Sequence, residues 1–272
     1  MTDRDDFGLA AVVRQLARSG GGGFEWYKDS CLLRRIEVRM RARGVGTMSG
    51  YAMLLSEDAV EVERLLHTLS VRVTSFFRNP DTWSRLLELL ASDRLGVTGE
   101  LSAWSMACAT GEEAWSLAML LLEHARQAGG APPPEGIRVC ASDVDAQALD
   151  IAVAGRYPSQ AEAAIRLILP RTYGAVRNGG FEVDAAVRDR VSFKREDLTA
   201  MTPARGWCDL VCCRNVLIFL GHEGQRRLLD AACTALRPGG LLVLGRTESL
   251  VAVPEAPLRP VDVTHRIYRR LP

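Results

Sequence analysis

The sequence predicts an α/β protein in which a doubly wound, mostly parallel sheet follows an all-α N-terminal region. From residue 101 onward, short apolar runs typical of buried strands alternate with segments of helical spacing, the order expected of strand-helix-strand units. Before about residue 70, apolar residues recur at helical spacing instead. A chain of 272 residues has room for one large or two smaller domains with a real core.

Composition narrows the class of protein. Lysine plus arginine number 34 against 33 aspartates plus glutamates, so the net charge of +1 indicates neither a nucleic-acid partner nor a membrane surface. The N-terminus lacks an apolar signal segment, and no apolar run approaches the roughly 18 residues of a membrane helix. The 7 cysteines are scattered without the paired spacing of a metal site, so we expect reduced thiols and no metal. We therefore expect a cytoplasmic protein without direct membrane insertion.

The N-terminal region is predicted to be helical, and its second helix carries a basic stripe. Arg35, Arg39 and Arg43 recur at i, i+4 and i+8, apart from the apolar positions of the same helix. Such a stripe is either a solvated face or a docking surface for an acidic helical partner. The first helix should stop at the flexible glycine run 20–23. The expected helices span residues 7–19, 28–43, 51–55 and 59–69.

A segment rich in β-branched and aromatic residues, 71–80, joins this region to the sheet. We expect an extended linker or turn with Phe76 and Phe77 as aromatic anchors and Arg78 at its surface. The Asn-Pro pair at its end should begin a helix that runs to about residue 90.

The stretch 101–118 predicts a strand, a tight loop and a helix. In an open α/β sheet, such a junction lies at the carboxyl end of a strand, where the helix N-terminus offers free N–H groups to a ligand. The loop is built from small residues but lacks G-x-G-x-x-G, and Glu112 and Glu113 would repel a phosphate. A cationic ligand therefore fits this junction better than a dinucleotide. The structural alternative is a capping box between Thr110 and Glu113.

Polar side chains also follow the next predicted strand, 137–143. Asp143 ends this strand and could accept hydrogen bonds from both hydroxyls of a ribose. Asp145, two residues further on, could cap the predicted helix 146–154.

Two later strands end in candidate binding residues as well. Strand 191–193 leads to Asp197 and Leu198, and strand 208–213 leads to Arg214 and Asn215. Each of these strands therefore contributes to the same edge of the predicted sheet.

The remaining elements complete the predicted sheet. Residues 157–190 interrupt the alternation and predict a small excursion with a hairpin that turns at Asn178 and Gly179. A helix over 222–236 and a strand over 241–245 follow.

Glu113, Asp143, Asp197 and Asn215 thus follow four strands whose carboxyl ends meet in one crevice. All four side chains can accept hydrogen bonds. That set suits a ligand with a ribose diol, an amino-bearing base and a positive charge, which are the features of S-adenosylmethionine. It suits the diphosphate of NAD poorly.

The chain closely resembles the chemotaxis receptor methyltransferases of the CheR type, from its N-terminal helices almost to its C-terminus. The matching motifs keep the family's order and nearly its spacing. They are LLRRIEVRM (32–40), VTSFFRNP (73–80), WSMACATGEE with SLA (104–113 and 116–118), ASDVD (141–145), CRNVLI (213–218), LRPGG (236–240) and GRTESL (245–250).

The resemblance implies a fold and a division into domains. The implied fold is a Rossmann-like class I methyltransferase sheet with a small antiparallel β subdomain, preceded by an all-α domain. The implied divisions are a receptor-docking all-α domain over 1–75, a linker and first helix over 76–92, and an S-adenosylmethionine-dependent methyltransferase domain over 93–272 with the subdomain at about 157–190.

The resemblance also implies methyl transfer from S-adenosylmethionine to glutamate side chains on the cytoplasmic helical bundle of a chemoreceptor. The product would be S-adenosylhomocysteine, and a monomeric enzyme is expected. A glutamate side chain ordinarily has a pKa of about 4.3, so the acceptor is already ionised at neutral pH and no general base is needed. Arg78 is the candidate to hold that carboxylate by a charge-assisted pair.

Site roles carry over by matching position. Thr74 and Arg78 would line the active site and the cofactor pocket, with Arg78 as the catalytic residue. Glu113 and Asp143 would hold the methionine and ribose ends of the cofactor. The residues implied to border the adenosine are Asp197, Leu198, Arg214 and Asn215, and the stripe of Arg35, Arg39 and Arg43 becomes the implied receptor-docking face.

Departures from the family pattern leave alternatives open. The family commonly has Tyr where this chain has Phe219, and Asn where it has Arg72 and Asp197. A catalytically weak adapter that works through the basic stripe is one alternative, and an S-adenosylmethionine-dependent enzyme with another acceptor is a second. The missing glycine motif disfavours an NAD oxidoreductase. The hairpin near 178–180 is short beside members that bind a receptor's C-terminal pentapeptide, so we expect a tether-independent enzyme.

Overall fold

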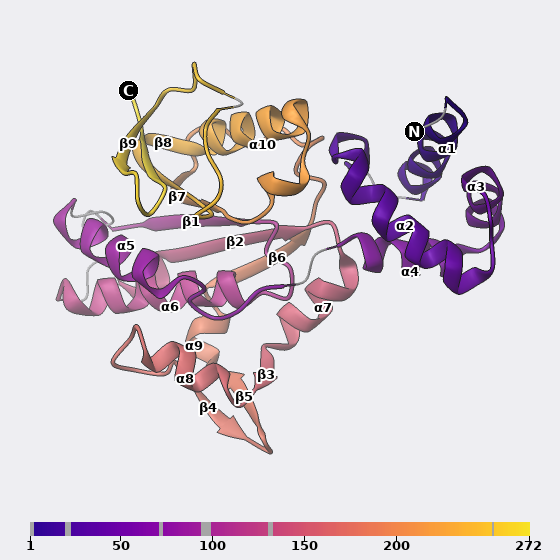
Figure 1. Cartoon of the computed structure of the whole chain (residues 1–272). Helices are drawn as coiled ribbons and strands as arrows, with labels where there is room; N and C mark the ends of the chain where they lie inside the picture. The colour runs from indigo at the N-terminus through magenta and orange to yellow at the C-terminus, as the bar shows by residue number, and fades with distance from the viewer. Residues whose placement is uncertain (1–2, 20–22, 71–72, 94–98, 130–132, 252) are drawn as a thin grey trace.

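The computed structural model describes residues 3–19, 23–70, 73–93, 99–129, 133–251 and 253–272, so Arg72 lies outside the described residues. Figure 1 shows a group of N-terminal helices beside a central sheet that has helices above and below it, and a small antiparallel subdomain that projects to one side. The predicted fold class is confirmed, because a mostly parallel sheet follows an all-α unit.

The N-terminal unit is a helical bundle with its own apolar core. The hydroxyl of Thr47 accepts a hydrogen bond from the N–H of Gly50 at 3.1 Å and begins the third helix. Asp58 begins the fourth in the same way, through the N–H of Glu61 at 2.9 Å. The four helices predicted here are confirmed, and a short 3-10 turn, η1, which was not predicted, lies between the first two. They are α1 (Asp3–Arg18), η1 (Phe24–Trp26), α2 (Asp29–Arg43), α3 (Met48–Glu57) and α4 (Ala59–Leu69).

The central sheet has the strand order β6-β2-β1-β7-β8-β10-β9, and the strands from β6 to β8 run parallel. β10 is antiparallel to both β8 and β9. Neither β9 nor β10 was predicted from the sequence. β8 also begins earlier than predicted, directly after the preceding helix. The strands are β1 (Leu101–Met106), β2 (Ile137–Asp143), β6 (Val191–Arg195), β7 (Cys208–Cys213), β8 (Leu236–Leu244), β9 (Leu258–Asp262) and β10 (Ile267–Arg270).

Helices cover both faces of this sheet (Figure 1). Because successive side chains of a strand point to opposite faces, each strand contributes to two cores. Ala103 belongs to the core beneath α5 and α6, whereas the next residue, Trp104, belongs to the core beneath α10. The helices are α5 (Pro80–Ser92), α6 (Glu112–Gln127), α7 (Ala146–Ala154) and α10 (His222–Ala235), with short 3-10 turns η2 (Pro134–Gly136) and η3 (Leu217–Phe219).

The β subdomain is a three-stranded antiparallel sheet of order β3-β5-β4. Its predicted hairpin turn is confirmed, since Asn178 and Gly179 both have positive φ, 49° and 80°. The hydroxyl of Tyr173 donates to Glu123 of α6 at 2.8 Å and joins the subdomain to the main body. Its elements are β3 (Arg156–Pro158), α8 (Ala161–Arg166), β4 (Gly174–Arg177), β5 (Gly180–Val183) and α9 (Ala185–Arg188).

In the part of the chain that the structure describes, no helix is both long and apolar enough to cross a membrane.

Candidate cofactor and acceptor site

The junction between β1 and α6 has a backbone that turns sharply at small residues. Ala107 and Ala109 have φ values of 55° and 49°, and Gly111 has a φ of 93°. A Cβ on Gly111 would stand 2.6 Å from the Cβ of Ala152, so only glycine fits against α7 there. A residue other than glycine that adopts the left-handed backbone conformation is strained, and such residues are often found at functional sites. The junction therefore has the geometry of a binding loop.

The capping-box alternative for this junction is wrong. Gly111, not Thr110, is the N-cap of α6, and no side chain caps it. The hydroxyl of Thr110 donates instead to the carboxylate of Glu112 at 2.6 Å. Glu113 lies in the first turn of α6, where it does not take part in a cap and lines the crevice.

Asp143 lies at the carboxyl end of β2 and is fixed by the backbone. One carboxylate oxygen accepts from the N–H of Ala109 at 2.8 Å, and the other accepts from the N–H of Asp145 at 2.9 Å. Burial raises the pKa of Asp143 above its usual range, although these N–H groups act against the rise. The predicted cap is confirmed, because Asp145 accepts from the N–H of Ala148 at 3.1 Å.

Glu113 is paired with the buried Arg214 across the strand ends. Its carboxylate accepts from Arg214 at 3.3 Å and from the hydroxyl of Ser105 at 2.9 Å. Burial raises the pKa of Glu113, while the charge of Arg214 and the two hydrogen bonds oppose that rise. The side chain of Arg214 is 2% exposed, and its Nε has no hydrogen-bond partner among the described residues.

Arg214 also fixes the segment that carries Arg78. Its second terminal nitrogen donates to the carbonyl of Arg78 at 2.7 Å and to the side chain of Asn79 at 3.1 Å. The N–H of Phe77 donates to the hydroxyl of Ser116 on α6 at 2.9 Å. The guanidinium of Arg78 donates to the carbonyl of Val73 at 2.9 Å.

A buried glutamate that was assigned no role from the sequence, Glu248, holds the loop after β7. One of its oxygens accepts from the N–H groups of Asn215 and Gly245, at 2.8 and 2.7 Å, and the other accepts from the N–H of Leu217 at 2.7 Å. Glu248 is 3% exposed to solvent. The signal in the sequence was the GRTESL motif itself, but nothing in that motif identified its contacts.

Two adjoining cavities lie along the strand ends. The first, here called the nucleoside cavity, contains four of the predicted residues, Asp143, Asp197, Leu198 and Asn215. The second, here called the acceptor cavity, contains the remaining predicted site residues from the crevice together with Asn215. Its lining includes Thr74, Arg78, Glu113, Arg214 and Asn215. Because Ala107, Ala109, Asn215 and Phe219 line both, the two cavities adjoin and share a wall.

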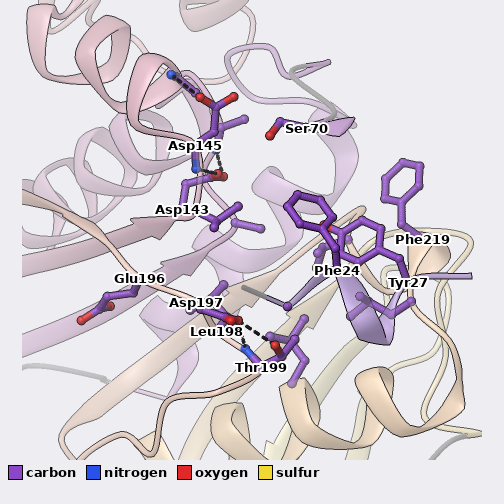
Figure 2. A pocket seen from close by; sticks show the side chains of 18 of the residues that line it. Phe24, Tyr27, Ser70, Asp143, Asp145, Glu196, Asp197, Leu198, Thr199 and Phe219 are labelled. Carbon is purple, nitrogen blue, oxygen red and sulfur yellow. Dashed lines mark hydrogen bonds between the residues drawn. The ribbon is translucent and has the colours of Figure 1, made fainter. Parts of the chain in front are cut away.

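Figure 2 shows the nucleoside cavity, with Asp143 and Asp197 on one side and the rings of Phe24 and Tyr27 on another. The hydroxyl and N–H of Thr199 both donate to one oxygen of Asp197, at 2.6 and 2.9 Å. Sequence reasoning missed Phe24, Tyr27 and Gly23, which belong to the N-terminal unit. The cluster of aromatic residues directly after the glycine run was the available signal.

The basic stripe on α2 differs from the prediction. Arg39 donates two hydrogen bonds to Glu61, at 2.9 and 2.7 Å, and Arg43 donates to both Glu61 and Asp58. Arg35 donates to the last carbonyls of α4. These guanidinium groups therefore hold α4 against α2, and the receptor-docking role of Arg35, Arg39 and Arg43 stays a prediction. The charge of Glu61, which is fully buried, explains why the arginines turn inward.

The groups that line the two cavities fit S-adenosylmethionine. Carboxylates lie in both cavities, small residues line the wall between them, and no phosphate-binding glycine loop is present at the described junction. Among the described residues, no group of three or more His, Cys, Asp or Glu side chains could hold a metal ion.

These features, on an open parallel sheet, define the class I methyltransferase fold that binds S-adenosylmethionine. Two family profiles agree with this class: "CheR methyltransferase, SAM binding domain" matches residues 72–266, and "CheR methyltransferase, all-alpha domain" matches residues 9–70. The chain belongs to the CheR methyltransferase family.

Several relatives share most of the chain. It is 31% identical over 253 residues to chemotaxis protein methyltransferase 2 of Pseudomonas aeruginosa, covering 91% of this chain and 88% of that one. It is 29% identical to the chemotaxis protein methyltransferase of Listeria monocytogenes, covering 88% of each. An uncharacterized 104.1 kDa protein of Rhodobacter capsulatus is 35% identical over 97% of this chain, which spans only 27% of that protein.

Solved methyltransferase structures are more distant. Magnesium protoporphyrin IX methyltransferase of Synechocystis, solved with bound S-adenosylhomocysteine, is 18% identical, with a TM-score of 0.34 over 60% of this chain and 53% of that one.

Proposed function

We propose that the protein transfers the methyl group of S-adenosylmethionine to glutamate side chains on the helical cytoplasmic domain of a chemoreceptor. The observation that carries this proposal is that the two cavities adjoin: Arg78 and Glu113 line the acceptor cavity, which shares a wall with the cavity that contains Asp143. The curated relatives named as chemotaxis protein methyltransferases support the same activity.

In this proposal, the chain orients its substrates and does not move a proton. S-adenosylmethionine, when bound, supplies a methyl group on a positively charged sulfonium. Asp143 accepts hydrogen bonds from the ribose hydroxyls, and Glu113 attracts the positive charge of the methionine end. Arg78 lines the acceptor cavity with N–H groups beyond the one that Val73 takes, and these hold the acceptor carboxylate. The acceptor is already ionised, so alignment supplies the rate enhancement.

The experiment is a methyl-transfer assay with purified receptor cytoplasmic fragments and radiolabelled S-adenosylmethionine. A glutamate methyl ester releases labelled methanol in alkali, so label that is incorporated and alkali-labile supports the proposal. We expect Arg78→Ala to lower kcat at least tenfold while binding of S-adenosylhomocysteine persists. Label that resists alkali, or transfer to a fragment whose glutamates have been replaced by alanine, would show a different acceptor.

We propose that the N-terminal unit docks the receptor through the exposed basic side chains of α2, Arg34 and Arg41, the second of which also pairs with Glu37 on the same helix at 3.3 Å. The guanidinium groups of Arg35, Arg39 and Arg43 are engaged within the unit, whereas Arg34 is exposed and the side chain of Arg41 is 79% exposed. Reversing both exposed charges to glutamate should raise the KM for the receptor fragment and leave S-adenosylhomocysteine binding unchanged. Reversal of Arg226, exposed on α10, is the matched control and should change neither.

A non-catalytic adapter is the second candidate, and Phe219 favours it. This side chain lines both cavities, where the family commonly has a tyrosine hydroxyl. Binding of S-adenosylhomocysteine together with receptor binding, but without methyl transfer, would support the adapter. Transfer that is regained or increased by Phe219→Tyr would show that the missing hydroxyl limits the rate.

A further inference from the structure

The nucleoside cavity has an aromatic side that comes from the N-terminal unit. Phe24, Tyr27 and Gly23 line it opposite residues of the methyltransferase sheet. The two rings lie 5.0 Å apart at an angle of 44° (Figure 2). Phe24 is 1% exposed, so it supports Tyr27 from within the helical core. The cavity is therefore assembled from both units.

The segment that carries these rings is fastened to the loop after β7. The N–H of Lys28 donates to the carbonyl of Phe219 at 2.9 Å, and its ammonium donates to the carbonyl of Ile218 at 2.8 Å. The N–H of Gly221 donates to the carbonyl of Trp26 at 2.7 Å. Tyr27 itself forms an isolated antiparallel bridge with Leu220. Because bonds on both sides of it fix the backbone, Tyr27 has a defined position in the cavity.

A second contact brings this segment directly against a predicted site residue. Gly23 has a φ of 86°, and a Cβ there would stand 2.8 Å from a carboxylate oxygen of Asp197. Only glycine allows the segment to approach Asp197 this closely. The N-terminal segment thus packs against the group expected to face the adenosine.

The hydroxyl of Tyr27 adds a hydrogen-bond donor to a cavity whose carboxylates accept. Burial, followed by the negative charge of Asp143 and Asp197, raises its pKa, so the hydroxyl stays protonated and can donate. The carboxylates of Asp143, Glu196 and Asp197 only accept when ionised. A nucleoside presents ring nitrogens and a ribose oxygen that need donors. Tyr27 makes no side-chain hydrogen bond to another described residue and has its donor available.

We propose that Tyr27 is a nucleoside-binding residue, with its ring forming part of the cavity wall and its hydroxyl donating to the nucleoside, so that cofactor binding joins the N-terminal unit to the sheet. This inference rests on the proposed function, because it assumes that the nucleoside of S-adenosylmethionine occupies this cavity. It adds a contribution from a part of the chain outside the methyltransferase sheet.

The test is calorimetric titration of the full chain with S-adenosylhomocysteine and, separately, with adenosine. We expect Tyr27→Phe, which keeps the ring, to weaken binding of both ligands about threefold to tenfold, the usual loss for one hydrogen bond. Tyr27→Ala should weaken both further. Tyr173→Phe removes a tyrosine hydroxyl that bonds to Glu123 outside both cavities, and it should leave both affinities unchanged.

The outcomes separate this inference from the function on which it rests. If the unaltered chain binds S-adenosylhomocysteine, Asp143→Ala abolishes binding and both Tyr27 variants bind normally, then the inference is overturned and the cofactor site stands. If the unaltered chain binds neither ligand, the inference about Tyr27 and the proposed function are both contradicted. A melting temperature of Tyr27→Phe equal to that of the unaltered chain shows that any loss of affinity is not a loss of folding.

Discussion

At the scale of single residues, the two carboxylates assigned to the cofactor are held in different ways. Asp143 is fixed by backbone N–H groups, whereas Glu113 depends on the side chains of Arg214 and Ser105. Substitutions other than to proline leave a backbone donor in place, whereas a side-chain partner is lost when its residue is replaced. Asp143 is therefore the more rigid of the two, and Glu113 is the one whose position depends on neighbouring side chains.

The raised pKa values of Asp143 and Glu113 predict that binding weakens in mild acid. Burial raises both pKa values, so the free protein takes up these protons at a higher pH than exposed carboxylates would. The ligand requires the ionised forms, so its affinity should fall as pH drops through this raised range and should recover above it. Calorimetry with S-adenosylhomocysteine at a series of pH values, from neutral pH into the acidic range, measures this effect. A pH-independent affinity over that interval would contradict the prediction.

Glu248 is predicted to be a positioning residue for the loop that borders both cavities. In Glu248→Gln, the charge is lost and an NH₂ group faces backbone N–H groups, which should cost about 1–3 kcal/mol of unfolding free energy. Loss of these hydrogen bonds should also displace Asn215. Because Asn215 lines both cavities, its displacement should weaken binding of S-adenosylhomocysteine. Urea unfolding and calorimetry check the two effects. Glu223→Gln on the exposed side of α10 is the control, and equal effects in the two variants would argue against a positioning role.

At the scale of elements, α2 and α4 are joined by a buried charge network. Glu61 accepts from Arg39, Arg43 and the hydroxyl of Tyr51, the last at 2.7 Å. Burial alone would raise the pKa of Glu61, but the hydrogen bonds from Arg39, Tyr51 and Arg43 outweigh it and hold the pKa below its usual value of 4.5. The network thus favours the ionised form of Glu61 in the folded bundle.

Glu61→Gln is predicted to destabilise the N-terminal unit by about 1–3 kcal/mol, because it removes the buried carboxylate that Arg39 binds with two hydrogen bonds and leaves Arg43 paired with Asp58 alone. The depressed pKa fixes the sign of the pH dependence: the contribution is complete above about pH 4.5 and is lost as pH falls through the lower folded-state value. Thermal unfolding followed by circular dichroism measures both effects. Glu37→Gln, exposed on the same helix as Arg39, is the control and should change stability by less than about 0.5 kcal/mol. Equal stability of Glu61→Gln and the unaltered chain would refute this role.

Elements that depend on local chemistry were predictable from the sequence. The hairpin at Asn178 and Gly179 and the cap at Asp145 follow from residues next to one another, and both are confirmed. The capping box offered as an alternative at the start of α6 was wrong because the left-handed backbone at Gly111 is set by packing against Ala152, which no local pattern contains. The direction of the α2 arginines depended on Glu61, some twenty residues away, and was missed for the same reason.

At the scale of the whole molecule, the site depends on contacts between distant parts of the chain. Strand ends predicted the positions of Asp143, Asp197 and Asn215 because parallel strands finish at one edge of the sheet. The contribution of Tyr27 could not be predicted, because its place in the cavity depends on a bridge to Leu220, far along the chain. Cavity-lining residues that follow the strands of the sheet can thus be predicted from the sequence, whereas those that reach the cavity from the N-terminal unit cannot.

The central claim is that the two cavities form one site for the cofactor and the acceptor carboxylate. A crystal structure of the protein grown with S-adenosylhomocysteine tests it most directly. The account predicts electron density with the nucleoside between Tyr27 and Asp143 and the amino-acid end near Glu113, which leaves Arg78 beside the sulfur. Ligand density elsewhere on the molecule, or confined to a place that Asp143 does not reach, would contradict it.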